Sequence, residues 1–185
     1  EAGHIVCCDG AINHLAQYGT IKAAIHLVGD GDSYDGEFNE IQFQPDPDQE
    51  TNDLTKAVKY CLLHDWKALV ILGATGLRED HPLGNISLLG QYAQMGVEAT
   101  MITNYGTFTT LTHSASLQSF PGQQVSIFSL TPDTAISVSG LRYPIENRPL
   151  RQWWEGTLNE AETDTFKVTF TQGTILIFQT HDPKA

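Results

Sequence analysis

The hydrophobic pattern changes near residue 107, and this change limits the possible folds more than any other feature of the sequence. Before it, short apolar runs alternate with segments in which apolar residues recur every three or four positions, a pattern typical of strands followed by amphipathic helices. After it, Thr, Ser, Val and Phe alternate in short runs separated by Pro and Gly, which is typical of β-strands. One chain therefore combines two folding patterns.

The first pattern predicts a parallel sheet. We expect strands over residues 4–8, 23–30, 39–44, 67–72 and 97–103, and helices over 11–19, over 50–66 and from Pro82 onward. Strands that alternate with helices are characteristic of parallel sheets with crossover connections. We therefore predict a Rossmann-like α/β domain over residues 1–107.

The second pattern predicts an all-β sandwich over residues 108–185. Its short runs recur about every 8 to 12 residues, the spacing of strands in antiparallel sandwiches and barrels. We find no low-complexity linker and no internal repeat between or within the two parts.

Polar loops follow three of the predicted strands. They are CDG at 8–10, GDGDS at 29–33 and GATGLREDH at 73–81. Ligands of open α/β sheets bind at the carboxyl ends of the strands. The three loops therefore mark the edge where a ligand would bind.

The loop after residue 28 gathers four carboxylates within residues 30–37. A calcium loop starting at Asp30 would need Gly and Glu at its sixth and twelfth positions, which hold Asp35 and Ile41. A dinucleotide fingerprint would need Gly at Tyr34, and no phosphate-binding P-loop occurs in the chain. Two interpretations stay open: a surface turn rich in Asp and Gly, or a metal clamp formed by Asp30 and Asp32.

A second acidic cluster, Asp48, Glu50 and Asp53, lies at the start of the helix over 50–66. Helix capping explains one or two of these carboxylates. The remainder could share a magnesium site with the first cluster. Lys56 could contact a phosphate, or could pair with Asp53 or Asn52.

The third loop offers groups that suit a nucleotide. Gly73 and Gly76 would expose backbone amides, and Arg78 could grip a phosphate with two hydrogen bonds. Asp80 suits a helix cap equally well, and His81 could bind a base, a phosphate or nothing. Farther along, Trp153 and Trp154 favour a core or interface position, or less commonly a platform on which a ring stacks.

Composition excludes several classes of protein. With 22 acidic and 10 basic residues the formal charge is −12, which argues against nucleic-acid binding, since such proteins need a cationic face. No apolar run is long enough to cross a membrane. Three cysteines, two of them adjacent, predict reduced buried thiols in a cytoplasmic protein, and the histidines lack metal-ligand spacing.

Five motifs occur in an order that resembles thiamine pyrophosphokinases: CDGAINHL, VGDGDS, DQETNDLTKA, LGATGLREDHPLGNISLL, and VSGLRYPIE followed by WWEGTLNEA. Together they span nearly the whole chain, from Cys8 to about Phe178. The resemblance implies an α/β domain followed by a sandwich, and a homodimer with its active site near the subunit interface. It also implies transfer of the terminal diphosphate of ATP to thiamine, giving AMP and thiamine diphosphate.

The resemblance assigns roles to individual residues. The catalytic set is Asp30, Asp32, Gln49 and Asp53, whose three aspartates would hold Mg²⁺. The ATP side is Asp9, Ser33, Lys56, Gly73, Thr75, Gly76, Arg78, Asp80 and His81. The thiamine side is Tyr143, Asn159 and Trp154, where an aromatic face would favour the thiazolium cation.

The chain departs from the family pattern at a few positions. Gly31 replaces a larger residue, Asn52 a Thr, and Leu158 the Ser of a Ser-Asn pair. The family's first strand, with its Asn-Gly loop, would precede residue 4. Two alternative functions stay open: another nucleotide-dependent diphosphotransferase on this scaffold, or a non-catalytic protein that binds thiamine or a nucleotide.

Overall fold

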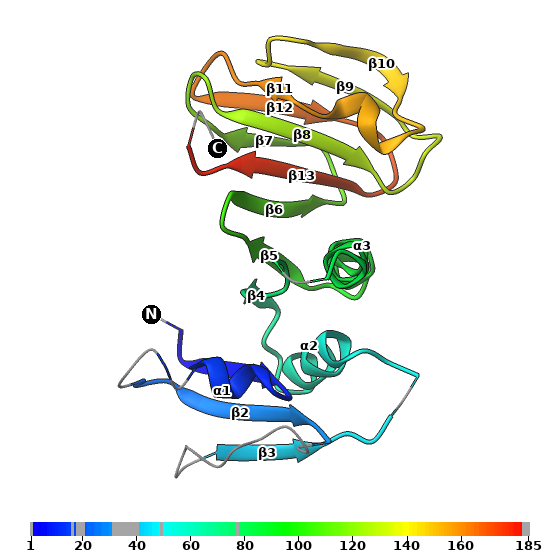
Figure 1. Cartoon of the computed structure of the whole chain (residues 1–185). Coiled ribbons are helices and arrows are strands. Elements are labelled where there is room, and N and C mark those ends of the chain that lie inside the picture. Colours follow the sequence, from blue (N-terminus) through cyan, green and yellow to red (C-terminus); the bar gives the residue numbers. More distant parts are fainter. Residues whose placement is uncertain are drawn as a thin grey trace. The chain divides into compact units, whose positions relative to one another are not determined.

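The structure, a computed structural model, describes residues 2–15, 17, 21–30, 41–48, 50–76 and 78–182. Contacts divide the chain into two compact units, Glu1–Lys67 and Ala68–Ala185, here called the N-terminal and the C-terminal unit (Figure 1). Each is described by itself. The chain is mostly sheet, with a parallel sheet in the N-terminal unit and mainly antiparallel pairing in the C-terminal unit.

The N-terminal unit contains a three-stranded parallel sheet in the order β1-β2-β3. Its strands are β1 (His4–Cys8), β2 (Ala24–Gly29) and β3 (Ile41–Pro45), and its helices are α1 (Ala11–Leu15) and α2 (Asp53–Leu63). The strands and helices predicted for this part of the chain are present, but α2 spans Asp53–Leu63 rather than 50–66, and the helix predicted over 11–19 is α1, which spans Ala11–Leu15. Residues 16, 18 and 19 of that prediction lie outside the described residues.

The two faces of this sheet carry different side chains because neighbouring residues of a strand point to opposite sides. Cys7, Ile25 and Leu27 form an apolar cluster with Ile12 of α1. On the other face, His26 lies against Tyr60 of α2. One helix therefore packs on each face.

The C-terminal unit contains two sheets, ordered β10-β9-β12-β7 and β11-β8-β13-β6-β5-β4. It begins with β4 (Ala68–Ile71), α3 (Asp80–Gln94) and β5 (Glu98–Ile102). The remaining elements are β6 (Gly106–Leu111), β7 (Ala115–Gln118), β8 (Gln124–Ser129), β9 (Ala135–Ser139), β10 (Ile145–Pro149), η2 (Trp153–Gly156), β11 (Asn159–Glu160), β12 (Thr165–Thr169) and β13 (Ile175–Thr180).

One sheet continues across the change in hydrophobic pattern. Strands β4 and β5 pair in parallel, and β5 then pairs antiparallel with β6 through Met101 and Phe108. The strands predicted over 67–72 and 97–103 are therefore present, but β5 joins them to the sheet of the C-terminal strands. The helix predicted from Pro82 is α3, in which Leu89 is fully buried.

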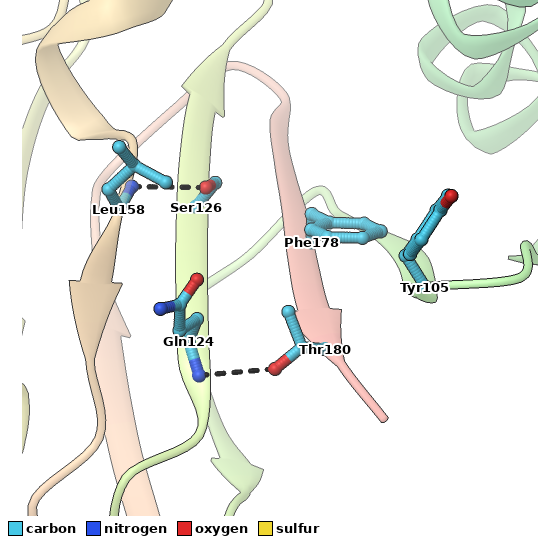
Figure 2. Close-up of a pocket in the computed structure, with 6 residues that line it drawn as sticks. All are labelled: Tyr105, Gln124, Ser126, Leu158, Phe178 and Thr180. Carbon is cyan, nitrogen blue, oxygen red and sulfur yellow. Dashed lines mark hydrogen bonds between the residues drawn. The ribbon is translucent and has the colours of Figure 1, made fainter. Parts of the chain in front are cut away.

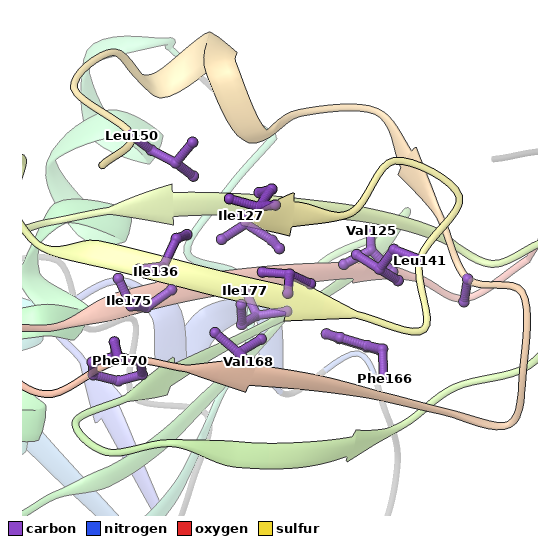
Figure 3. Close-up of a cluster of buried hydrophobic side chains, with 13 residues drawn as sticks. Val125, Ile127, Ile136, Leu141, Leu150, Phe166, Val168, Phe170, Ile175 and Ile177 are labelled. Atoms are coloured by element: carbon purple, nitrogen blue, oxygen red, sulfur yellow. The ribbon is translucent and has the colours of Figure 1, made fainter. Parts of the chain in front are cut away.

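The core of the C-terminal unit lies between its two sheets. Figure 3 shows its apolar side chains, contributed mainly by β8, β9, β12 and β13. The fully buried members include Ile127, Ile136, Val168 and Ile177. Inward positions alternate with outward ones along each strand, as in sandwiches. None of the described helices combines the length and the apolar content needed to cross a membrane.

Candidate functional site

Asp9 and Asp30 follow the ends of the neighbouring strands β1 and β2. The backbone N–H of Asp9 donates to the carbonyl of Val28 at 3.0 Å, so the two exits stay side by side. Gly29 has φ +151°, and a Cβ there would lie 3.1 Å from the Cβ of Asp9. The absence of a side chain at Gly29 therefore lets Asp9 lie against the turn that leads to Asp30.

The carboxylate of Asp9 is partly unsatisfied. Its Oδ1 atom is buried and has no hydrogen-bond partner within the described part of the chain. A buried polar atom without a partner is costly and is uncommon away from sites that bind ligands or water. This oxygen is suited to a ligand group, such as a cation or the water bound to one.

The first turn of α2 supplies the next groups. Asn52 caps the helix by accepting the N–H of Thr55 at 3.0 Å, so its amide performs the capping that the Thr of the family pattern would perform. Asp53 is half exposed, whereas the Lys56 side chain is only 6% exposed. Lys56 Nζ lies 3.3 Å from Asp53 Oδ1, which confirms the predicted pairing.

Asp9 and Asp53 both act on the same thiol. Burial raises the pKa of Cys8 to about 12, and the negative charges of Asp53 and Asp9 contribute to this rise. Both carboxylates therefore lie within electrostatic range of the end of β1. Of the predicted residues, Asp53 and Lys56 are in direct contact, and Asp9 follows the end of β1.

Asp48 orders the loop before α2. Its carboxylate accepts the N–H of Glu50 at 2.9 Å and the hydroxyl of Thr51. The Thr51 hydroxyl is the first cause of a lowered pKa at Asp48. Part of the second acidic cluster therefore serves the loop itself.

The donor set of the N-terminal unit fits Mg²⁺ chemically, because it consists of carboxylate oxygens and includes the unsatisfied oxygen of Asp9. Among the described residues, no three His, Cys, Asp or Glu side chains lie close enough to hold a metal ion. Asp32, Ser33 and Gln49 of the predicted site lie outside the described residues. Asp30 and Asp53 are the described members of the predicted metal set.

In the C-terminal unit, the loop between β4 and α3 exposes backbone. Gly73 and Gly76 have φ of +69° and +97°, which other residues rarely adopt, and no atom lies within 4 Å of an added Cβ at either. Asn85 in α3 donates to the carbonyl of Ala74 at 3.0 Å and fixes the loop near Thr75. The loop therefore presents an open stretch of backbone before the start of α3.

Asp80 holds Arg78 beside the same helix. The guanidinium contacts both carboxylate oxygens, with Nε 3.3 Å from Oδ1, and it lowers the pKa of Asp80. Asp80 also accepts the backbone N–H of His81 at 3.0 Å. All three side chains are exposed, so a phosphate could compete with Asp80 for Arg78. The expected role of Asp80 as the helix cap is wrong, because α3 begins at Asp80 and its N-cap is Glu79, which makes no side-chain capping bond.

Asn159 is buried, and its carboxamide binds the backbone of Tyr143. Its Oδ1 accepts the Tyr143 N–H at 3.0 Å, and its Nδ2 donates to the Tyr143 carbonyl at 2.7 Å. The Tyr143 side chain is 62% exposed. Asn159 therefore fixes the backbone that presents the ring of Tyr143.

Leu158 adopts φ +57° and is 75% exposed, while its N–H donates to Ser126 Oγ at 3.2 Å. It lines a pocket of about 280 Å³, shown in Figure 2, on the sheet that contains β8 and β13. The other lining residues are Tyr105, Gln124, Ser126, Phe178 and Thr180.

These other five pocket residues were not predicted from the sequence. Gln124 and Ser126 are two residues apart in β8, and Phe178 and Thr180 are two residues apart in β13. This spacing places each pair on one face of its strand and is the sequence pattern that could have indicated the pocket. Of the paired tryptophans, Trp153 packs edge-on against Phe128, and Trp154 is 74% exposed.

Comparisons with known proteins match both parts of the chain. Residues 1–101 match the model described as thiamin pyrophosphokinase, catalytic domain, and residues 106–178 match thiamin pyrophosphokinase, substrate-binding domain. The chain belongs to the thiamin pyrophosphokinase family. The candidate residues from Asp9 to His81 lie within the first match, and Tyr143, Trp154 and Asn159 lie within the second.

Individual relatives agree with the family. The chain is 24% identical to thiamin pyrophosphokinase 1 of Caenorhabditis elegans, over 96% of this chain and 79% of that protein. It is similar in fold to thiamin pyrophosphokinase from Candida albicans, with a TM-score of 0.83 and 19% identity over 98% of this chain and 82% of that chain. A family member from Enterococcus faecalis has a TM-score of 0.78 and 21% identity, over 96% of this chain and 88% of that chain.

Proposed function

We propose that this chain is a thiamine pyrophosphokinase that transfers the diphosphate of ATP to the hydroxyl of thiamine, giving AMP and thiamine diphosphate. The observation that carries the proposal is the ion pair of Asp53 and Lys56 in the first turn of α2, within the match to the catalytic domain. The proposal includes a Rossmann-like domain over residues 1–107 and a sandwich over 108–185, in a cytoplasmic homodimer with its active site near the subunit interface.

In this reaction the thiamine hydroxyl oxygen attacks the β-phosphorus of ATP. The hydroxyl loses its proton to solvent, and a bond forms between the hydroxyl oxygen and the β-phosphorus. The bond from the β-phosphorus to the bridging α–β oxygen breaks, and AMP leaves with the bridging oxygen. Asp53 would orient the hydroxyl. Lys56 and Arg78 would offset phosphate charge, and most of the acceleration would come from positioning.

Asp30, Asp32 and Asp53 would hold Mg²⁺. When bound, this ion would supply positive charge beside the phosphate oxygens. Asp9, Ser33 and Gln49 would complete the surroundings, and the backbone of Gly73, Thr75 and Gly76, with His81, would receive the remainder of ATP. Lys56 supports this assignment because its ammonium lies 3.3 Å from Asp53 and so puts a positive charge beside the proposed metal set.

The thiamine side would lie on the C-terminal unit, at exposed aromatic residues. The rings of Tyr143 and Trp154 offer faces that attract the thiazolium cation, and the pocket beside Leu158 offers both apolar walls and hydroxyl groups. Ser126 Oγ lies next to Leu158 and could supply a hydroxyl that the family pattern carries at position 158.

An assay of AMP release from ATP and thiamine, with Mg²⁺ and with EDTA, tests the proposal. We expect Mg²⁺-dependent AMP formation. Asp32→Asn should lower turnover about 100-fold or more, the scale for losing one preorganised electrostatic group. Asp35→Asn, which changes a neighbouring loop carboxylate without a proposed role, is the matched control. Near-normal AMP release by Asp32→Asn would contradict the assignment.

The same assay separates the alternatives. Release of AMP with other primary alcohols but not with thiamine would indicate a different diphosphotransferase, and release of ADP would indicate transfer of a single phosphate. Calorimetric binding of thiamine without any product would indicate a binding protein that lacks turnover.

A further inference from the structure

A group of aromatic and histidine side chains joins the sheet of the N-terminal unit to α2, away from the carboxylates. It consists of His4, His26, Tyr60, His64 and Trp66, and we call it the histidine–tyrosine clamp. Within the structurally described region these residues form no metal cluster. None of them belongs to the candidate site described above.

A chain of hydrogen bonds crosses the clamp. His4 Nδ1 lies 3.1 Å from His26 Nε2, and His26 Nδ1 lies 3.0 Å from the hydroxyl of Tyr60. His26 is only 2% exposed and Tyr60 is also buried. The chain therefore connects β1, β2 and α2 through polar atoms, with His4 at its exposed end and the bond between His26 and Tyr60 buried. In a buried layer, directional bonds fix geometry more strictly than apolar contacts do.

Trp66 closes the clamp over the end of α2. Its ring stacks on His4 at 4.0 Å and on His64 at 4.8 Å between centroids. The backbone N–H of Trp66 donates to the carbonyl of Cys61 at 2.9 Å, and His64 Nδ1 lies 2.9 Å from the carbonyl of Tyr60. The last turn of α2 is therefore held to the first part of β1.

The clamp and the candidate site lie at opposite ends of the same three elements. His26 precedes Asp30 by four residues on β2, His4 precedes Asp9 by five on β1, and Tyr60 follows Asp53 by seven on α2. Seven residues are about two helical turns and about 10 Å of rise, so Tyr60 and Asp53 lie on one side of a rigid rod. A shift of α2 at Tyr60 would reach Asp53 and Lys56 undiminished.

We infer that His26 and Tyr60 are positioning residues, which set the position of α2 along the sheet and so fix Asp53 and Lys56 relative to β1 and β2. The inference rests on the proposed function for its catalytic consequence. The other buried residues of α2 are Thr55, Lys56, Ala57, Val58 and Cys61, and the apolar contacts of the last three are not directional. The hydrogen bonds of the clamp are directional and therefore fix the position of α2 more strictly.

Tyr60→Phe tests this role because it removes one hydroxyl and keeps the ring. We expect kcat for AMP release to fall about 10-fold, since displaced catalytic groups lose rate steeply, with the KM for thiamine within about twofold of wild type. We also expect faster amide hydrogen exchange at residues 53–57. Ile12→Val, which removes one buried methyl group from the opposite face of the same sheet, is the control and should change neither kcat nor this exchange.

The second readout separates this inference from the proposed function. If wild-type protein releases no AMP from ATP and thiamine, the proposed function fails, but exchange at residues 53–57 still decides whether Tyr60 positions α2. Wild-type exchange there in Tyr60→Phe would overturn the inference. If Tyr60→Phe does not fold, His4→Phe keeps the stacking on Trp66 and removes the outer hydrogen bond. It should then change exchange in the same direction, and no change would overturn the inference.

Discussion

The two units differ in what they bury. The core of the C-terminal unit is a single large apolar cluster, and buried polar residues such as Gln123 and Asn159 bond to backbone, as in the 2.7 Å bond from Gln123 Nε2 to the carbonyl of Thr180. The N-terminal unit instead buries the ionisable residues His26 and Lys56. Within the described residues, its buried side-chain atom without a hydrogen-bond partner is a carboxylate oxygen of Asp9, whereas those of the C-terminal unit are the uncharged hydroxyls of Thr109, Thr110 and Thr134. Buried ionisable groups cost stability and are typical of functional sites. The comparison separates a unit that buries ionisable groups from a unit whose core is one apolar cluster.

The largest expected effect is on the apolar core of the C-terminal unit. Phe166→Ala removes a ring that is 2% exposed and should cost about 4 kcal/mol in the free energy of unfolding. Phe43→Ala in the N-terminal unit removes a ring that is 48% exposed and should cost well below this. Chemical denaturation measures both. Equal losses would contradict the difference in burial that separates these two positions.

A second expected effect concerns the thiols of the N-terminal unit. Burial raises the pKa of Cys7 and Cys61 to about 11 and that of Cys8 to about 12, from 9.0. Only the thiolate reacts with alkylating reagents. Near pH 8, native protein should therefore be alkylated at least about 100-fold more slowly than denatured protein, as a time course by mass spectrometry would show. Fast labelling of the native thiols would indicate that this unit opens readily.

The close packing of the C-terminal unit gives a third test. A Cβ at Gly106 would lie 2.3 Å from the carbonyl oxygen of Gln179, so Gly106→Ala should cost about 2 kcal/mol through forced displacement. At Gly84 in α3 no atom lies within 4 Å of the added carbon, so Gly84→Ala should stabilise by about 0.5–1 kcal/mol through helix propensity. Thermal unfolding of the two variants should move in opposite directions.

The smallest expected effect is a pH dependence of the N-terminal unit. Burial, and then the charges of His4 and His64, lower the pKa of His26 below its usual 6.5. Below about pH 6.5 the unfolded chain binds a proton that the folded chain excludes, so stability falls as the pH falls. Melting temperatures between about pH 7.5 and 5.5 should show this decline, and His26→Gln should reduce its slope. An unchanged slope would assign the decline to other groups.

Local signals in the sequence predicted much of the fold. Apolar periodicity identified the strands and α2, and Pro82 identified the first turn of α3, because these patterns depend on neighbours within a turn or two. The pairing of Lys56 with Asp53 was predictable for the same reason, since they are three residues apart. The role of Asn159 was not, because its amide binds Tyr143, sixteen residues away.

The sequence by itself determined the element types, the order of the motifs and hence the family. Only the tertiary structure decided that β5 continues into the sheet of β6, that Asp9 lies against Gly29, and that His26 meets Tyr60 across 34 positions of sequence. The physical reason is range. Periodicity and capping are set by adjacent backbone geometry, whereas these contacts depend on strand pairing and helix packing, which no local pattern specifies.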